Sequence, residues 1–210
     1  MSIAIIGTGN MAKGLAGIFS AAGLEVTLGA RNVAKGKEVA AAINDLVRAT
    51  DIAAAVSKSD IVVLAVPYGE AADALRNAGD LAGKLLIDIT NPLTADYMAL
   101  TIGHTTSAAE EIQKLAPSAS VVKAFNTIFA QILQGGGTIA GVGATVFIAG
   151  DDDSANERVA AIVEKAGLKA LKTGGLKNSR YLEPLAGLNI ALGYGRGFGT
   201  AIAPTWSGIA

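Results

Sequence analysis

Short apolar runs alternate along the chain with longer stretches in which apolar residues recur every three or four positions. The runs are rich in Val, Ile and Leu and lack polar alternation, which is typical of parallel strands that helices cover on both faces. Strands are expected at Ser2–Ile6, Glu25–Gly29, Ile61–Val66, Leu85–Ile89, Ser120–Ala124, Thr145–Ala149 and Lys169–Thr173, with a weaker one near Leu46–Ala49. Helices are expected at Asn10–Ala22, Ala34–Asn44, Ile52–Lys58, Glu70–Ala78, Ser107–Leu115, Ser154–Ala166 and from Asn178 to about Gly197.

This alternation of strands and helices predicts an α/β fold, a Rossmann-type doubly wound and mostly parallel sheet followed by a short C-terminal helical segment. Asp51 and Ser154 each precede a helical stretch and are expected to cap it. The segment Ala124–Gly150 is uncharged and long enough to span a membrane, but its Asn, Gln and clustered Gly residues favour loop and strand. We therefore expect no membrane span.

Composition narrows the classes of function. Hydrophobic residues make up 51% of the chain and charged residues 17%, with a net charge of −1. These values exclude a mainly disordered chain and argue against nucleic acid or an anionic membrane as partner. The chain has no cysteine and one histidine, His104, so thiolate sites, cysteine nucleophiles and multi-histidine metal sites are excluded. Asp151–Asp153 are expected to start a helix and not to bind metal. The N-terminus lacks the basic region of a signal peptide, so we expect a cytoplasmic protein.

The strongest motif follows the first strand directly and opens the first helix. Gly7, Gly9 and Ala12 form the pattern G-x-G-x-x-A. The first Gly allows a tight turn, the second lets the backbone approach a pyrophosphate, and the small third residue keeps the helix close to the strand. Free N–H groups at the helix N-terminus then face the phosphates. The motif in this context predicts a dinucleotide site.

The end of the second strand indicates which dinucleotide binds. An NAD site places Asp or Glu there to hold the ribose 2′-hydroxyl, and none is present. Arg31 and Asn32 follow the strand instead, and Lys35 lies in the next turn. Because Arg can grip a phosphate with two hydrogen bonds and Lys adds charge, the sequence favours NADP over NAD.

Three more strands end in polar or proline-containing segments. Ligands in open α/β sheets bind outside these ends. Candidate binding residues here are Val66, Pro67, Asn91, Pro92, Asn126 and Thr127. No Tyr-x-x-x-Lys pair or G-x-S-x-G elbow is present, so the sequence offers no catalytic acid, base or nucleophile.

The chain resembles the coenzyme F-420 (F420) dependent NADP oxidoreductase family and the NADPH domain of the six-transmembrane epithelial antigen metalloreductases. The resemblance rests on the segments Gly7–Met11, Gly29–Asn32, Ala65–Pro67, Val121–Thr127 and Gly174–Arg180 with Leu182 and Glu183. It implies that NADPH passes a hydride to a flavin-like acceptor such as F420, FMN or FAD. It also implies that Thr8, Gly9, Asn10 and Met11 contact the pyrophosphate and nicotinamide ribose. The 2′-phosphate would be held by Arg31, Asn32 and Lys35, and the nicotinamide end would be lined by Pro67, Asn91, Pro92, Asn126 and Thr127.

Two other functions stay open from the residues alone: NADPH-dependent reduction of a small imine or keto compound, and non-catalytic NADP sensing. We expect residues 1–175 to form the NADP-binding domain and residues 176–210 a helical extension that completes the acceptor site or a dimer interface. Small residues recur every fourth position in that extension, at Gly187, Ala191, Gly195 and Gly199. On one helix such a stripe permits close packing, either against the parent sheet or against a second copy of the chain, and we expect it to mediate a homodimer.

Overall fold

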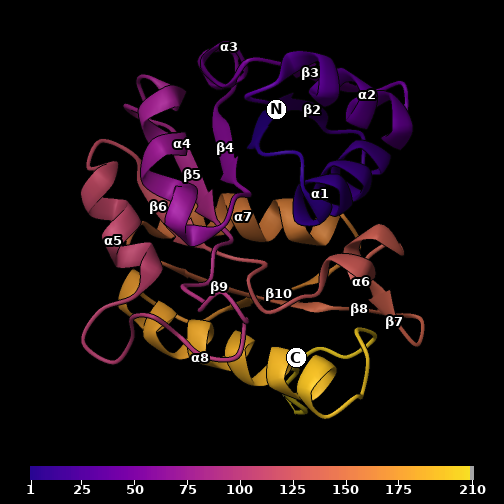
Figure 1. Cartoon of the computed structure of the whole chain (residues 1–210), viewed down its shortest axis with the longest axis vertical. Coiled ribbons are helices and arrows are strands. Elements are labelled where there is room, and N and C mark those ends of the chain that lie inside the picture. Colours follow the sequence, from indigo (N-terminus) through magenta and orange to yellow (C-terminus); the bar gives the residue numbers. More distant parts are fainter. Residues whose placement is uncertain (209–210) are drawn as a thin grey trace.

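The computed structural model describes residues 1–208 and is built around one eight-stranded sheet (Figure 1). The strand order is β10-β9-β6-β5-β4-β1-β2-β3, so the first six strands have the Rossmann order 3-2-1-4-5-6. The strands are β1 (Ser2–Ile6), β2 (Glu25–Gly29), β3 (Val47–Thr50), β4 (Ile61–Leu64), β5 (Leu85–Asp88), β6 (Ser120–Lys123), β9 (Thr145–Gly150) and β10 (Lys169–Lys172). The expected α/β fold is confirmed, including the weak strand near Leu46–Ala49.

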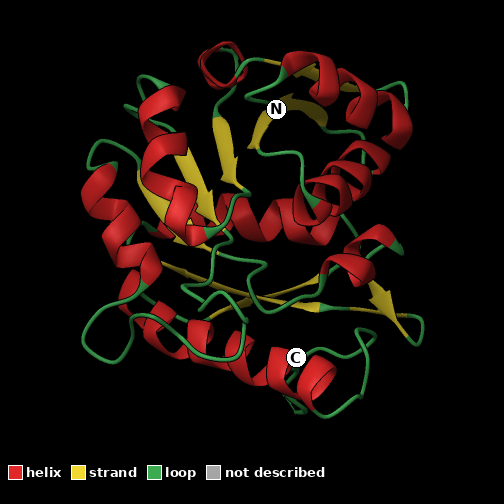
Figure 2. Ribbon diagram, viewed as in Figure 1, coloured by secondary structure: helices red, strands yellow, loops and turns green. Residues whose placement is uncertain are grey.

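Helices cover both faces of the sheet (Figure 2). The main helices are α1 (Asn10–Ala21), α2 (Val33–Ile43), α3 (Ile52–Ser57), α4 (Ala71–Ala78), α5 (Ala108–Leu115), α6 (Ala130–Gln134), α7 (Asp153–Lys165) and α8 (Ser179–Ile190). Three short turns complete the helical part: η1 (Tyr68–Glu70), η2 (Leu176–Asn178) and the π-helical η3 (Ala191–Gly195).

Successive residues of each central strand serve opposite faces of the sheet. Ile3 and Ile5 belong to the hydrophobic cluster formed with α1, α6 and α7, whereas Ala4 and Ile6 belong to the cluster formed with α3, α4 and α5. All four are fully buried. Because both faces are covered, these strands need apolar residues at every position, which explains their continuous apolar runs.

The last two strands reverse direction. β6 pairs antiparallel with β9, and β10 pairs parallel with β9. Ser120 Oγ donates to Asp152 Oδ2 at 3.0 Å, so the end of β9 lies beside the start of β6. The strand β9 lies between α7 and α8 (Figure 1). Val146 and Ile148 on one face join the cluster that contains α7, and Phe147 and Ala149 on the other face pack against Leu182 of α8. The helix α8 therefore starts near the amino edge of the parallel strands and runs toward their carboxyl edge.

Several local expectations need correction. Asp51 does cap α3, accepting a hydrogen bond from Ala54 N at 2.8 Å. Ser154, however, is not a cap: Asp152 accepts from Ser154 N and Ala155 N, so α7 begins earlier. The carboxylate two residues upstream reaches the free N–H groups first.

The uncharged segment 124–150 contains a helix that the sequence analysis missed. Its residues form the end loop of β6, the short helix α6, a hairpin of β7 (Thr138–Ile139) and β8 (Val142–Gly143), and β9. Within residues 1–208, no helix combines the length and apolarity that a membrane crossing requires.

The stripe of small residues is not continuous. α8 gives way to the π-helical η3 after Ile190, and Gly199 lies beyond the helix with a φ of +77°. The glycine of this segment that packs most tightly is Gly193, where an added Cβ would lie 2.8 Å from Phe129 Cζ. The change in helix type alters which residues share a face, so the four-residue spacing does not describe one surface here.

Candidate functional site

The crevice where a Rossmann sheet binds nucleotides lies between β1 and β4, where the strand order reverses. The loops after β1, β2, β4, β5 and β6 share one edge because these strands are parallel. Every candidate binding residue from the sequence lies in one of these loops or in the first turn of the helix that follows.

The turn between β1 and α1 needs its two glycines for different reasons. Gly7 has a φ of +126°, and an added Cβ would lie 2.3 Å from Ala65 O. Gly9 precedes α1 with an ordinary φ of −76°, and an added Cβ would meet nothing within 4 Å. No side chain caps α1, and its first turn carries no acidic residue. The space in front of Gly9 is therefore open and adjoins free N–H groups, which fits an anion such as pyrophosphate.

Basic residues gather where β2 ends. Arg31 and Lys35 are exposed, and the Asn32 side chain accepts a hydrogen bond from Lys35 N at 3.1 Å, which caps α2. Arg31 Nη1 lies 2.9 Å from Glu70 Oε2 of η1, and these side chains are 76% and 46% exposed. The Asn32 side-chain oxygen therefore already accepts a hydrogen bond from α2, and the Arg31 guanidinium already pairs with the Glu70 carboxylate.

Two asparagines join the ends of β5 and β6. Asn91 Nδ2 donates to Asn126 O at 2.8 Å, and Asn126 Nδ2 donates to Asn91 Oδ1 and to Leu182 O, both at 3.0 Å. Asn189 Nδ2 of α8 donates to Thr127 O at 3.1 Å. These bonds attach the loop after β6 to α8 directly and the loop after β5 to α8 through Asn126.

The candidate residues differ in exposure. Gly9, Asn10, Arg31, Asn32, Lys35 and Pro67 are exposed; Gly7, Thr8, Met11, Val66 and Asn91 are half-buried; Pro92, Asn126 and Thr127 are buried. Asn126 Oδ1 has no hydrogen-bond partner among the described residues. The buried group can form the floor of a ligand site, and Asn126 retains one free acceptor.

A fully buried ion cluster lies directly beneath these loops. Lys123 Nζ lies 2.6 Å from Asp88 Oδ2 and 2.8 Å from Glu183 Oε1, and it donates to Thr90 O at 2.7 Å. All three charged side chains are at most 1% exposed. Burial alone would lower the pKa of Lys123, but the carboxylates of Asp88 and Glu183 outweigh burial and raise that pKa.

The cluster also reaches α5. Glu183 accepts hydrogen bonds from Ala108 N at 2.8 Å and Ala109 N at 3.2 Å. A carboxylate at the N-terminus of a helix satisfies free N–H groups and interacts favourably with the helix dipole. One glutamate of α8 therefore links the ends of two strands to the start of α5.

Strained backbone follows the cluster. Phe125 has a φ of +60° although it is not glycine, and its side chain is fully buried. It lies between Lys123 and Asn126 and packs edge-on against Phe19 at 5.7 Å between ring centroids. Strain of this kind persists where surrounding contacts hold a segment in one geometry.

The sequence analysis assigned no role to four residues of this region, Asp88, Lys123, Glu183 and Glu70, although Lys123 and Glu183 lie in the segments that carry the family resemblance. A charged residue that ends an apolar strand was the available signal for Asp88 and Lys123, since such residues are buried only when paired. Glu183 and Glu70 carried no comparable signal, because their partners lie far away in the chain.

The comparisons with known proteins agree with this geometry. A family model described as "NADP oxidoreductase coenzyme F420-dependent" matches residues 2–92. The F420-dependent NADP reductase of Methanothermobacter thermautotrophicus is 33% identical over 211 residues, which cover 91% of this chain and 89% of that protein. The chain belongs to the F420-dependent NADP oxidoreductase family. Its resemblance to that family, inferred above from short motifs, is thereby confirmed.

The proteins that resemble this chain differ in how much of their length it matches. Metalloreductase STEAP3 of Rattus norvegicus is 32% identical over 183 residues, which cover 87% of this chain and 36% of that protein. The chain thus spans about a third of the metalloreductase. A crystal structure from Arthrobacter sp. FB24, proposed to be an F420-dependent NADP reductase, superposes with a TM-score of 0.84 at 30% identity and covers 94% of this chain and 96% of that one. A reductive aminase from Aspergillus terreus, at 20% identity and a TM-score of 0.67, shares the fold.

Proposed function

We propose that this protein is an NADPH-dependent oxidoreductase that transfers a hydride between NADPH and a deazaflavin or flavin-like acceptor. The observation that carries the proposal is the open turn at Gly9, beside the uncapped N-terminus of α1 and at the point where strand order reverses. Membership of the F420-dependent family supports the same reaction class.

The nucleotide would bind across the carboxyl edge of the sheet. Thr8 and Gly9 of the turn, with Asn10 and Met11 at the start of α1, would hold the pyrophosphate. Arg31 and Lys35 would hold the 2′-phosphate. Asn32 would contribute through its amide NH₂, because its oxygen already caps α2. The absence of an acidic residue at the end of β2 supports the preference for NADP.

The nicotinamide end would lie over the loops that follow β4, β5 and β6. Val66, Pro67, Asn91 and Pro92 would line it, with Asn126 and Thr127 forming its floor. Bound NADPH supplies the hydride, so the protein's task is to orient the two rings and exclude water.

The test is anaerobic mixing of the NADPH-loaded protein with F420, FMN, FAD and ferric chelates in turn, following loss of NADPH absorbance. Turnover with F420 supports the proposal in full, and turnover with only FMN or FAD supports the flavin-like class. Stoichiometric NADPH binding without turnover on any acceptor would instead support a sensor.

Two variants separate this reaction from imine or carbonyl reduction, which needs a placed proton donor. His104 is exposed, and Tyr68 is half-buried at the end of β4. Burial, followed by the negative charges of Glu111 and Glu183, raises the pKa of Tyr68, so it stays protonated at neutral pH. We expect His104→Ala and Tyr68→Phe to change hydride transfer to F420 by less than about threefold. A loss of about 100-fold in either would favour the proton-dependent reaction.

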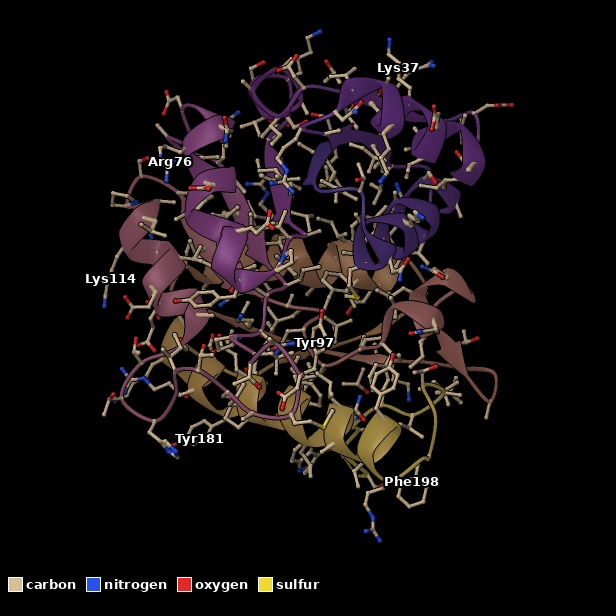
Figure 3. The ribbon with its side chains drawn as sticks, in the orientation of Figure 1. Lys37, Arg76, Tyr97, Lys114, Tyr181 and Phe198 are labelled. Carbon is tan, nitrogen blue, oxygen red and sulfur yellow. The ribbon has the colours of Figure 1, made fainter. Side chains whose placement is uncertain are left out.

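We further propose a homodimer formed through the C-terminal segment 176–208. Five of its large apolar side chains are more than half exposed: Tyr181, Leu188, Tyr194, Phe198 and Trp206. Figure 3 shows Tyr181 and Phe198 pointing away from the sheet. Two apolar hollows of about 390 Å³ each lie along α8, both lined by Leu185. Contiguous apolar surface of this kind is typical of an interface.

Light scattering tests the dimer. We expect the wild type to have twice the monomer mass and Leu188→Asp to be monomeric. Leu46→Asp changes a leucine that is also more than half exposed but lies on the other half of the molecule, and this variant should stay dimeric. A wild-type mass near 21.0 kDa at micromolar concentration would contradict the proposal.

A further inference from the structure

The ion pair between Arg31 and Glu70 spans the nucleotide crevice. Arg31 follows β2, and Glu70 ends η1 after β4. β1 lies between these two strands (Figure 1), so the pair crosses the carboxyl end of β1 and the loop that contains Gly7 and Gly9. The distance between Arg31 Nη1 and Glu70 Oε2 is 2.9 Å, so the guanidinium that the proposed function assigns to the 2′-phosphate has a carboxylate as its partner.

The Glu70 side chain makes no other hydrogen bond or ion pair with the residues that the structure describes. Glu70 immediately precedes α4, but its side chain makes no capping hydrogen bond. It is about half exposed, and its ion pair with Arg31 is the one polar contact that this side chain makes within residues 1–208. An exposed ion pair adds little to stability, so a structural role explains its position poorly.

We propose that Glu70 is a specificity-determining residue that competes with the nucleotide 2′-phosphate for Arg31. This inference rests on the proposed function, because it assigns Arg31 to that phosphate. A phosphate monoester carries a charge near −2 and three acceptor oxygens, so it can displace a single carboxylate from a guanidinium. NAD(H) lacks that phosphate and therefore has no group at this position that could replace the Glu70 carboxylate beside Arg31.

The competition weakens NADP(H) binding and speeds its release. Removing the Glu70 charge frees Arg31 and also removes a negative charge near the phosphate. Glu70→Gln should therefore tighten NADPH binding by about twofold to fivefold, the range that corresponds to the strength of exposed ion pairs. NADH binding should change by less than about 1.5-fold, since no 2′-phosphate is involved.

The experiment is calorimetric titration of the nucleotide-free protein with NADPH and NADH at low ionic strength, where exposed charges interact most strongly. The variants are Glu70→Gln, Arg31→Ala and the double variant. The matched control is Asp73→Asn, which removes the exposed ion pair between Asp73 and Arg76 on the neighbouring helix α4. Stopped-flow displacement measures the NADPH dissociation rate in each.

We expect Glu70→Gln to tighten NADPH binding and slow its dissociation, Asp73→Asn to match the wild type, and Glu70→Gln to have no effect once Arg31 is Ala. Unchanged or weaker NADPH binding in Glu70→Gln would overturn the inference. The proposed nucleotide site is judged separately by Arg31→Ala: a loss specific to NADPH supports that site even if Glu70 fails, and equal losses for NADPH and NADH would refute the site itself.

Discussion

Replacing Lys123 by Met should destabilise the protein strongly, because it leaves two carboxylates buried without a cation. Lys123 Nζ is within 2.8 Å of both Asp88 and Glu183, and the lysine side chain is 0% exposed. Removing one partner of a buried ion cluster costs about 3–5 kcal/mol of unfolding free energy. At about 2–4 °C per kcal/mol for a chain of this size, the melting temperature should fall on the order of 10 °C.

A second substitution should reduce the loss of unfolding free energy that Lys123→Met causes. Lys123→Met with Asp88→Asn removes one of the two uncompensated charges, whereas Glu183 keeps its hydrogen bonds from Ala108 N and Ala109 N. We expect the double variant to recover about 1–2 kcal/mol relative to Lys123→Met, which is a typical coupling energy between residues in contact.

Urea unfolding followed by circular dichroism measures these differences, and Lys114→Met is the control. Lys114 pairs with Glu111 at 2.8 Å but is 67% exposed, so its loss should cost less than about 1 kcal/mol. The reasoning is refuted if Lys123→Met costs no more than Lys114→Met, or if Asp88→Asn makes Lys123→Met worse.

The same cluster predicts a pH dependence. The pKa of Lys123 is raised in the folded protein, chiefly by Asp88 and Glu183 acting against burial. The charged form of Lys123 therefore contributes its full share of the unfolding free energy below the pKa of an unfolded lysine, about 10.4. This stabilisation is lost as pH rises through the folded-state pKa. Unfolding free energies measured between pH 8 and pH 11 should decline more steeply in the wild type than in Lys123→Met.

Three further variants test the turn and a second ion pair. Gly7→Ala should destabilise the protein by about 2–4 kcal/mol in urea unfolding, because Cβ would meet Ala65 O at a positive φ. Gly9→Val should stay within about 1 kcal/mol of wild-type stability yet lose NADPH binding in a fluorescence titration, because its side chain would enter the open phosphate space. The Arg180 hydrogen bond lowers the pKa of Glu110, so this pair stabilises the protein above the unfolded value of about 4.3 and loses its effect as pH falls through the folded-state pKa. Arg180→Met should accordingly lose less stability than the wild type between pH 5 and pH 3 in thermal melts.

The sequence predicted correctly those features that depend on residues close together in the chain. The G-x-G-x-x-A turn, the apolar strands and the Asp51 cap each depend on residues a few positions apart, and each is found where the sequence predicts it. The helix α6 was missed because five residues show too little periodicity to recognise.

Contacts between distant segments escaped prediction. Glu183 meets Lys123 and Ala108, which are separated from it by 60 and 75 residues. Nothing near Glu183 in the chain marks it as buried. The pairing of Arg31 with Glu70 across β1 likewise depends on strand order, which local patterns do not reveal.

Because β9 and β10 run antiparallel to the other strands of the sheet, α8 crosses from the amino edge of the parallel strands to their carboxyl edge. α8 starts at one edge of the sheet and reaches the other, where Asn189 meets the loop after β6. Glu183 and Asn189 are six residues apart on α8, so this spacing sets the distance between the contact with Lys123 and the contact with Thr127. Inserting one residue between them would rotate Asn189 by about 100° and move it about 1.5 Å along the helix. Such an insertion would break either the contacts of Glu183 or the hydrogen bond from Asn189 Nδ2 to Thr127 O, so the length of α8 between these two residues cannot change.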